Sequence, residues 1–454
     1  MPDAGRGRQP LSRIRGHLRR RDRAAGAQLP VVSGAGAEAL RAAVAPVLDR
    51  AGAGTLVVAL SGGGDSTALL LLARDWARAR GREILAVTVD HGLRPGSAAE
   101  AAAAGALCAR LGVPHAVRAW TGWDGAGNLQ DAARRARRRL IGRFARDRGA
   151  AAVLLGHTLD DQAETFLMRL ARGSGVDGLA AMRAETAWDR LPVLRPLLGL
   201  RRAALRDHLR AEGVAWSEDP SNADPRFARV RFRAALETLE ALGLGPERLA
   251  ETAAAMGRAR VALERATADL ARDALTAGPA GDVAIDLART GAAPREIRLR
   301  LFAGALGWVA GDPYRPRLAS LERALEALEA GAAPGLTLHG CLARRVGARV
   351  LIRREPAAVA PPVPLARGRW DGRWEWRGAG ADPGLTIGAL GAEGLARCGD
   401  WRARGLKREA LLSTPALWRG RTLVAAPIAR PEAAAAAFAR ISAAPAPWEL
   451  TLLR

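Results

Sequence analysis

Short apolar runs alternate with helical patterns between residues 55 and 233. The runs have strand length, and they are rich in Val, Ile and Leu at 55–60, 84–90, 113–117 and 153–156. Between them, apolar residues recur at about every third or fourth position, most clearly at 66–80 and 131–148. This alternation predicts an α/β fold, in which crossover helices connect the strands of a parallel sheet. Ligands of such sheets bind at the carboxyl ends of the strands, so the residues that directly follow the strands are the candidates for a site.

The pattern changes on both sides of this region. Strand signals are absent from residues 234–332, where Ala, Leu, Glu and Arg dominate, and this predicts a helical domain. Short β-type runs return in residues 333–454, which are expected to form a small mixed α/β domain. Residues 1–50 are expected to form a disordered basic tail and a leading helix. The α/β domain is therefore expected at 51–233.

Composition narrows the classes of partner. Hydrophobic residues make up 49% of the 454 residues, which is enough for large cores and excludes wholesale disorder. The chain has 69 Lys and Arg against 46 Asp and Glu, a net charge of +23. Lys407 is the only lysine, so coding bias explains the use of arginine but not the excess of basic residues. A polyanionic partner such as nucleic acid and a generally basic, solvated surface both agree with this charge.

Other sequence features argue against several classes of protein. No stretch of about 18 uninterrupted apolar residues and no signal-peptide core follow the arginine-rich start, so we expect a cytoplasmic protein without a membrane segment. The three cysteines, Cys108, Cys341 and Cys398, are too far apart to form a CxxC pair. This spacing argues against a disulfide framework, a zinc ribbon and an iron–sulfur site.

The first candidate motif, Ser-Gly-Gly-Gly-Asp-Ser at 61–66, follows the strand at 55–60 and precedes a helix. Glycines let the backbone approach a phosphate closely, and the start of a helix attracts anions. It is not a Walker A loop, because no Gly-Lys-Ser/Thr follows. Asp65 is the candidate ligand for Mg²⁺, which prefers a few carboxylate oxygens together with substrate phosphates.

Two more motifs stand at strand ends. Asp-His-Gly-Leu-Arg at 90–94 could line a ligand site or form an ordinary turn. Residues 156–165 read GHTLDDQAET, in which Thr158 and Asp161 have the spacing of a helix capping box. Capping does not explain why His157, Asp160 and Glu164 gather at the same strand end. Asp160 and Glu164 lie one helical turn apart and could hold an ammonium group or a metal.

The motif at 61–66 resembles the PP-loop of the ATP-pyrophosphatase superfamily, SGGxDS. Other motifs resemble the tRNA(Ile)-lysidine synthetase family in order along the chain: HGLR at 91–94, NLQDAAR at 128–134, GHTLDDQAET at 156–165, RGSG at 172–175, RPLL at 195–198, DPSN at 219–222, RVR at 229–231, YRPR at 314–317 and LHGC at 338–341. The chain departs from the family at Thr158, where many relatives have a second histidine. Its arginine-rich helix at 134–139 also lacks the tyrosine that is frequent in the family.

The resemblance implies an adenine-nucleotide α-hydrolase-like (PP-loop) domain and a two-step reaction that uses ATP and Mg²⁺. The C2 oxygen of the wobble cytidine of tRNA(Ile) with anticodon CAU attacks the α-phosphate of ATP and releases pyrophosphate. The ε-amine of L-lysine then attacks C2, AMP leaves, and the product is lysidine. The implied ATP-binding residues are those of the loop: Ser61, Gly62, Gly63, Gly64, Asp65 and Ser66.

The implied chemistry gives further residues a role. A guanidinium such as Arg134 suits the charge that accumulates on the phosphates. Asp160, Asp161 and Glu164 are the candidates for holding lysine, and His157 is the candidate for proton transfer or phosphate contact. The residues expected to contact the tRNA backbone, or equally to form an ordinary helix surface, are Arg229, Arg231 and Arg233.

Three alternatives belong to other functional classes. A tRNA thiolase would activate a base in the same way but would need a reactive cysteine pair or a cluster. A synthetase for a small metabolite would not need the charge of +23. An RNA-binding module with a degenerate loop would have lost chemical residues, whereas Asp65, Asp160, Asp161 and Glu164 are present. The sequence does not predict the oligomeric state.

Overall fold

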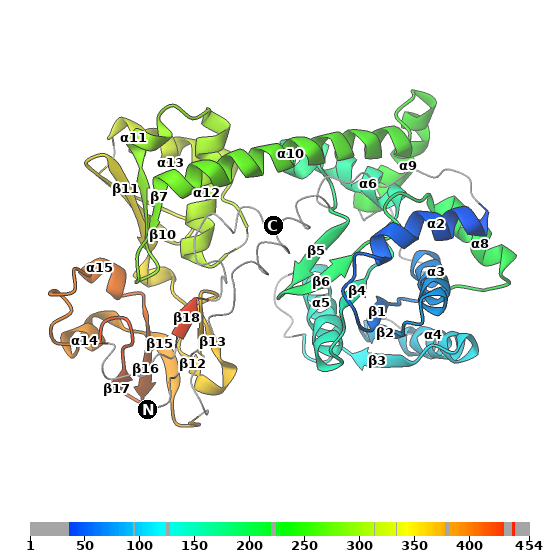
Figure 1. Ribbon diagram of the computed structural model, residues 1–454, viewed down its shortest axis with the longest axis horizontal. Coiled ribbons are helices and arrows are strands. Elements are labelled where there is room, and N and C mark those ends of the chain that lie inside the picture. The colour runs from blue at the N-terminus through cyan, green and yellow to red at the C-terminus, as the bar shows by residue number, and fades with distance from the viewer. Residues whose placement is uncertain are drawn as a thin grey trace, which may run out of the picture. The chain divides into compact units, whose positions relative to one another are not determined.

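The computed structural model describes residues 36–93, 96–123, 128–218, 224, 226, 228–312, 314–332, 334–376, 382–430 and 438–440. It contains two compact units, one that ends at Val261 and one that begins at Ala262. The boundary falls within the long helix α10 (Pro246–Ala274), which is visible in Figure 1. The expected leading helix is α2 (Ala37–Leu48), and the expected basic tail before residue 36 lies outside the described residues.

The first unit is built on a six-stranded sheet in the order β3-β2-β1-β4-β6-β5. The pairs β1–β2, β2–β3, β1–β4 and β4–β6 are parallel, and only the edge strand β5 runs antiparallel to its neighbour β6. The strands are β1 (Leu56–Ala59), β2 (Ile84–Asp90), β3 (His115–Ala119), β4 (Ala152–Leu154), β5 (Glu185–Trp188) and β6 (Leu191–Leu194). The predicted α/β fold with a parallel sheet is thus confirmed.

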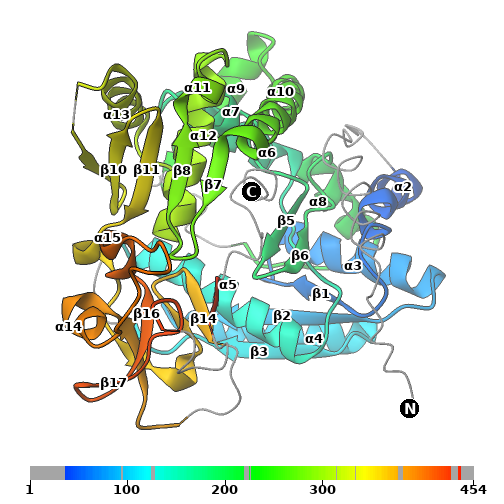
Figure 2. The ribbon, with the colours of Figure 1, turned by 60° about the vertical axis from the view of Figure 1, so that its left-hand side comes forward.

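Helices cover both faces of this sheet (Figures 1 and 2). Because successive side chains of a strand point to opposite faces, Leu56 and Val58 of β1 pack in one core while Val57 packs in another. The first core includes residues of α2, α3 (Gly64–Ala79), α4 (Ser97–Leu111) and α8 (Arg202–Ala211). The second includes residues of α5 (Leu129–Asp147). A sheet that is buried on both faces explains why its strands are continuous apolar runs.

A third core in this unit packs α6 (Leu159–Leu170) against α9 (Ala228–Ala241) and the first turns of α10. Ala163, Phe166 and Leu167 of α6 meet Leu236 of α9, as the apolar spacing along α6 predicts. The short helix α7 (Val176–Leu179) follows α6. This packing places the arginines at the start of α9 beside the acids at the start of α6.

The second unit contains a five-stranded antiparallel sheet in the order β7-β8-β11-β10-β9. Helices α12 (Arg295–Ala310) and α13 (Leu318–Ala330) pack on it around Phe302, Leu306 and Leu328. The strands are β7 (Leu275–Ala277), β8 (Val283–Asp286), β9 (Leu336–Leu338), β10 (Cys341–Val346) and β11 (Arg349–Arg354), and α11 (Leu287–Thr290) follows β8.

Residues 234–332 are not entirely helical, contrary to the prediction from the sequence pattern, because they contain two strands of this sheet. Strand β8 lies inside that range and pairs with β11, which lies beyond it, so one sheet crosses the expected boundary at 332–333. Strands β7 and β8 have only three and four residues. Runs this short do not show a period that distinguishes a strand from a helix.

Two smaller sheets complete the second unit, in the orders β12-β15-β16-β17 and β13-β14-β18. Their strands are β12 (Val363–Pro364), β13 (Arg369–Trp370), β14 (Trp374–Trp376), β15 (Thr386–Ala389), β16 (Pro415–Arg419), β17 (Thr422–Ala425) and β18 (Phe438–Arg440). The short helices here are η2 (Pro356–Ala358), η3 (Leu365–Arg367), α14 (Gly391–Ala396) and α15 (Arg408–Leu411). These elements agree with the expected mixed C-terminal region.

Candidate active site at the ends of β1 and β4

The candidate site lies where the strand order of the first sheet reverses. After β1 the chain continues to β2 on one side, whereas β4 pairs with β1 on the other side. In parallel sheets, the loops diverge at such a point and leave a crevice at the carboxyl ends of the strands. The motif at 61–66 follows β1 and the motif at 156–165 follows β4, so the fold brings the two motifs to this crevice.

The loop after β1 is held in shape by its own serines. The Oγ atom of Ser66 donates to the carbonyl oxygen of Gly63 at 2.9 Å and accepts from the backbone N–H of Ser61 at 3.1 Å. Gly62 has a φ of +83°, which favours glycine, and its carbonyl accepts from the N–H of Ser217 at 2.9 Å. Helix α3 then begins at Gly64. A rigid glycine turn before a helix start is suited to binding phosphate.

Asp65, in the first turn of α3, is paired with an arginine that the sequence did not single out. The Nε atom of Arg202 donates to Oδ2 of Asp65 at 3.0 Å, and its Nη2 atom donates to Oδ1 of Asp161 at 2.8 Å. The backbone N–H of Arg202 donates to Oδ2 of Asp160 at 2.7 Å. Burial raises the pKa of Asp65, and although Arg202 opposes this shift, the neighbouring charge of Asp161 adds to it.

Asp161 and Glu164 are held by more arginines. The Nη2 atom of Arg229 donates to Asp161 at 2.9 Å, and Nε of Arg233 donates to the fully buried Glu164 at 2.8 Å. Arg229 also pairs with Glu164. Burial pushes the pKa of Asp161 upward, but Arg229 and then Arg202 outweigh burial and hold this pKa below its ordinary value. Asp161 is therefore ionised at neutral pH.

The predicted capping box at the start of α6 is confirmed. The backbone N–H of Thr158 donates to Oδ2 of Asp161 at 2.8 Å, and the N–H of Asp161 donates to Oγ1 of Thr158 at 3.3 Å. One oxygen of Asp161 thus caps the helix while the other faces the arginines. The same carboxylate serves a structural contact and a contact in the candidate site.

His157 lies on the basic side of the site. Its Nδ1 atom is buried and has no hydrogen-bond partner within the described part of the chain. Burial, followed by the nearby charge of Arg195, lowers the pKa of His157 to about 4. Burial and the charges of Arg134 and Arg138 in turn lower the pKa of Arg195 to about 10. His157 is therefore neutral at pH 7, and the arginines around it form an electropositive group suited to an anion.

The structure brings together most of the residues singled out in the sequence. Asp65, Asp160, Asp161 and Glu164 all contact Arg202. Arg134 is exposed on α5, and its charge contributes to the lowered pKa of Arg195. Of the histidine motif at 90–94, His91 meets the edge of Trp120 with ring centres 5.8 Å apart, while Arg94 lies outside the described residues.

Two residues expected on the tRNA surface have different positions. Arg229 turns toward Asp161 and Glu164 and pairs with both, while 43% of its side chain stays exposed. Arg231 is exposed, and its Nη1 atom donates to the carbonyl of Arg226 at 3.1 Å. Arg229 and Arg231 thus differ in environment, because only one side of α9 packs on α6.

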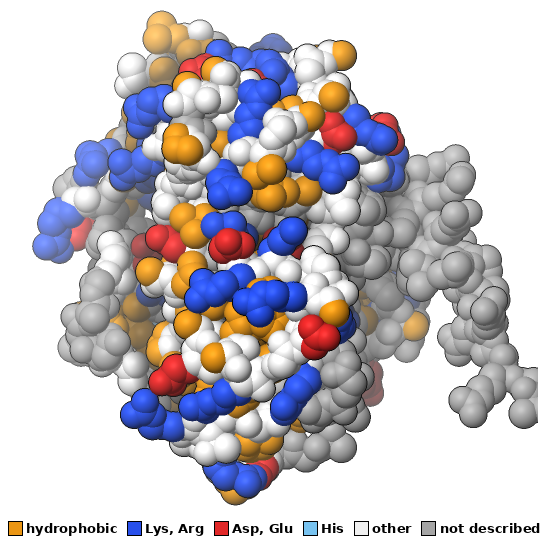
Figure 3. Space-filling model, turned by 90° about the vertical axis from the view of Figure 1, so that its left-hand side faces the viewer, with side chains coloured by type: hydrophobic (Ala, Val, Ile, Leu, Met, Phe, Trp, Pro, Cys, Tyr) orange, Lys and Arg blue, Asp and Glu red, His pale blue; other side chains and the backbone are white. Residues whose placement is uncertain are grey.

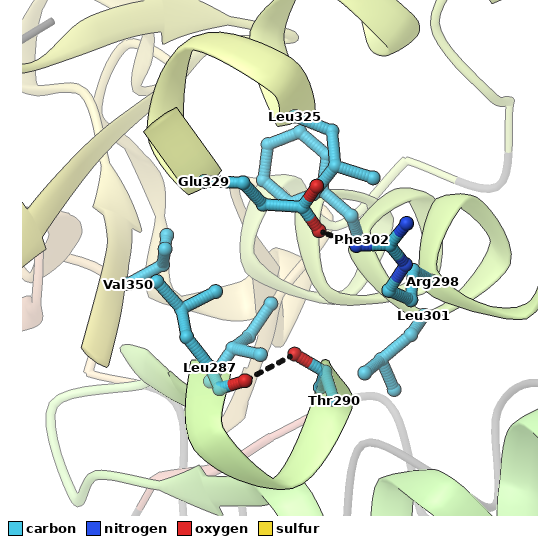
Figure 4. Close-up of a pocket in the computed structure, with 9 residues that line it drawn as sticks. Leu287, Thr290, Arg298, Leu301, Phe302, Leu325, Glu329 and Val350 are labelled. Atoms are coloured by element: carbon cyan, nitrogen blue, oxygen red, sulfur yellow. Dashed lines mark hydrogen bonds and ion pairs between the residues drawn. The ribbon is translucent and has the colours of Figure 1, made fainter. Parts of the chain in front are cut away.

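A cleft of about 340 Å³ opens beside the acids. It is lined by Asp160, Arg202, Ala203, Arg206, Asp207, Arg210 and Arg233. A second cavity, within the second unit, has a volume of only about 10 Å³, roughly one water molecule. Figure 4 shows it between apolar side chains and the ion pair of Arg298 with Glu329, whose atoms are 2.8 Å apart. Of these two spaces, the cleft in the first unit is the larger, and it borders the charged cluster through Asp160, Arg202 and Arg233.

The loop, the strand order and the charged cluster define a PP-loop ATP-binding domain. The family model described as a PP-loop domain matches residues 37–239, which include the loop at 61–66 and the charged cluster at the ends of β1 and β4.

The relatives define the family more closely. The tRNA(Ile)-lysidine synthase of Ruegeria pomeroyi is 48% identical over 375 residues, which are 82% of this chain and 88% of that protein. The tRNA(Ile)-lysidine synthase of a Methylobacterium species is 45% identical over 312 residues, 67% of this chain and 90% of that protein. This chain belongs to the tRNA(Ile)-lysidine synthase family.

Solved structures match a smaller part of this chain than these relatives do. The U34-tRNA thiolase NcsA from Methanococcus maripaludis, solved with its 4Fe-4S cluster, covers 49% of this chain and 78% of its own, with 17% identity and a TM-score of 0.43. An NMN synthetase from Francisella tularensis covers 48% of this chain and 93% of its own, with 13% identity and a TM-score of 0.32. Among the described residues, no helix is both long and apolar enough to cross a membrane.

Proposed function

We propose that this chain attaches L-lysine to C2 of the wobble cytidine of tRNA(Ile) with anticodon CAU, with release of AMP and pyrophosphate. The observation that carries the proposal is the meeting of a phosphate-type loop at 61–66 with the acids of 160–164 at neighbouring strand ends. The loop suits ATP, and the acids suit the ammonium groups of lysine. The names and the identities of the relatives support the same reaction.

ATP binds with its phosphates against the loop and the start of α3. Asp65 would hold Mg²⁺, and its donor chemistry fits, because this ion takes one or two carboxylates together with substrate phosphates. Among the described residues, no group of three His, Cys, Asp or Glu side chains is arranged to hold a metal ion. The ion would neutralise charge on the departing pyrophosphate. Arg134 and Arg195 supply positive charge on the side of His157.

Lysine binds through Asp160, Asp161 and Glu164. Its ε-ammonium must lose a proton, and this ammonium has a pKa of about 10.4. Transfer to His157, whose pKa is about 4, would cross roughly six pKa units and cost about 8 kcal/mol. His157 is therefore better suited to contact a phosphate than to act as the base in this state, which narrows the two roles that the sequence left open.

The tRNA binds to a basic surface. Arg231 of the first unit is exposed, and on the face of the molecule drawn in Figure 3 the side chains of Arg and Lys are widely spread. Exposed basic residues of the second unit include Arg344, Arg349, Arg402, Arg404, Lys407 and Arg408. The net charge of +23 favours the polyanion.

A thiolase is the second candidate, and the cysteines disfavour it. Cys108, Cys341 and Cys398 are all free and buried. Burial raises the pKa of Cys108 to about 11, so its sulfur is protonated and unreactive at neutral pH. Burial raises the pKa of Cys398 as well. Sulfur transfer requires a thiolate that attacking reagents can reach.

The experiment measures AMP and pyrophosphate from the full chain with ATP, Mg²⁺, L-lysine and transcripts of tRNA(Ile) with anticodon CAU. Release of both products that depends on this tRNA supports the proposal. Asp65→Ala should abolish release while the affinity for tRNA is retained. If the wild type releases no pyrophosphate, or if Asp65→Ala releases it at the normal rate, the assignment of the loop is wrong.

A further inference from the structure

Arg202 joins two parts of the site that come from different strand ends. Figure 2 shows α8, which begins at Arg202, beside α3, which carries Asp65. The guanidinium contacts Asp65 of α3 at 3.0 Å, Asp161 of α6 at 2.8 Å and Glu164 of α6 at 3.5 Å. Its side chain is only 17% exposed. One cation thus bridges the residue assigned to the ATP metal and two of the acids assigned to lysine.

The acids of this cluster are already balanced by arginines. Three carboxylates face three guanidinium groups, those of Arg202, Arg229 and Arg233. Burial alone would lower the pKa of Arg202, but Asp161, Asp65 and Glu164 outweigh burial and raise it. An ammonium group can therefore reach these carboxylates only if a guanidinium moves away, because a further buried cation without a partner is costly.

Arg202 is the arginine of the three that also holds Asp65. Arg229 and Arg233 contact the α6 acids from α9, and both are more exposed than Arg202. When nucleotide phosphates and their metal meet Asp65, that carboxylate gains a cation while new negative charge appears beside Arg202. The cleft of about 340 Å³ is lined by both Arg202 and Asp160, so a displaced guanidinium and a small ligand have room there.

We propose that Arg202 is a positioning residue that couples the nucleotide site to the lysine site. When nucleotide binds, the guanidinium of Arg202 moves away from Asp161 and Glu164 and toward the phosphates. This inference rests on the proposed function. It means that lysine binds weakly to the free chain and more tightly after ATP. The order would keep lysine out of the site until the activating nucleotide is present.

The test is calorimetric titration of L-lysine into the full chain, with and without Mg²⁺ and α,β-methylene-ATP, which cannot release pyrophosphate. For the wild type, the nucleotide should increase the lysine affinity by about fivefold or more, a typical coupling between sites. In Arg202→Gln the acids are free of this guanidinium in both states. The two lysine affinities should then agree to within about twofold, with the nucleotide-free affinity above that of the wild type.

A purely structural role predicts the opposite result, since Arg202→Gln would then weaken lysine binding in both states and leave the coupling intact. The matched control is Arg74→Gln, because Arg74 is 15% exposed and pairs with Asp75 at 2.7 Å on α3. This control should keep the coupling. If Arg202→Gln does not fold, as judged by its circular dichroism, Arg202→Lys replaces it. A lysine keeps the charge but cannot bridge three carboxylates, so the coupling should shrink.

Wild-type protein that binds lysine equally with and without nucleotide would overturn the inference, and so would full coupling in both Arg202 variants. These results would leave the proposed function standing. In contrast, a wild type that binds no lysine in either state would contradict the proposed function itself.

Discussion

Gly156 lies directly against the backbone of Asp65. A Cβ atom at residue 156 would stand 3.1 Å from both the carbonyl carbon and the carbonyl oxygen of Asp65. This distance is tighter than nine in ten Cβ contacts in proteins, so the backbone of Asp65 would have to move by a few tenths of an ångström. The end of β4 and the first turn of α3 therefore touch through their backbones, and this contact sets the distance between the loop at 61–66 and the acids of α6.

Gly156→Ala should displace the loop, because the clash is with backbone rather than with a flexible side chain. Misplacement of reacting groups by a fraction of an ångström to an ångström is expected to slow pyrophosphate release by about tenfold to a hundredfold. Pyrophosphate release is measured under saturating ATP. The control is Gly257→Ala within α10, where an added Cβ meets nothing within 4 Å. An unchanged rate in Gly156→Ala would show that this backbone contact does not set the loop position.

Asp161→Asn separates the two roles of this carboxylate. The carboxylate oxygen Oδ2 of Asp161 accepts from the N–H of Thr158, and the amide oxygen of asparagine can accept this hydrogen bond instead. The negative charge beside Arg229 and Arg202, however, is lost. The KM for lysine should therefore rise by about tenfold or more, the effect of losing a charged hydrogen bond, while the KM for ATP changes little. Steady-state kinetics with each substrate varied in turn check this. Equal effects on both substrates would leave Asp161 with a capping role only.

The lowered pKa of His157 predicts a pH-dependent stability. In the unfolded chain His157 has a pKa near 6.5, and in the folded chain the pKa is about 4. The unfolded state binds the proton more tightly, so stability is full above pH 6.5 and falls as the pH decreases toward 4. The loss from this group is about 3 kcal/mol at pH 4. Urea unfolding of the wild type and of His157→Gln between pH 7 and pH 4 measures it. Equal slopes for the two proteins would contradict the assignment.

Arg231 and Arg229 should differ in their effect on tRNA binding. Arg231 is exposed and Arg229 faces the acids, although only one residue separates them along α9. Arg231→Gln should weaken tRNA binding and reduce the slope of log affinity against log salt concentration by about one. Arg229→Gln should leave this slope unchanged and affect lysine instead. Filter binding over a series of salt concentrations compares the two variants, and identical slopes for both would remove Arg231 from the tRNA surface.

Features that repeat over several residues, or that lie directly after a strand, are predictable from the sequence. The parallel sheet followed from continuous apolar runs, and Ser66, Thr158 and Asp161 followed from local patterns that form loops and caps. These contacts join residues a few positions apart, so a window of the sequence contains both partners.

The contacts that the sequence does not predict join segments that are far apart along the chain. Arg202 stands 137 residues from Asp65 and 41 residues from Asp161. In a chain with so many arginines, nothing in the neighbourhood of Arg202 distinguishes it from Arg201 or Arg206. The inward turn of Arg229 depends on the packing of α9 against α6, which periodicity along α9 alone does not orient. Strands β7 and β8 are not predictable from the pattern, because each is shorter than the pattern that identifies a strand.

The reaction that we propose for this chain is the transfer of lysine to the wobble cytidine of one tRNA. The most direct measurement is nucleoside mass analysis after incubation of the full chain with ATP, Mg²⁺, isotopically labelled lysine and either tRNA(Ile) with anticodon CAU or elongator tRNA(Met). We predict a labelled lysidine nucleoside from tRNA(Ile) and none from tRNA(Met). Cleavage of ATP to AMP with no lysine on either tRNA, or equal modification of both, would contradict it.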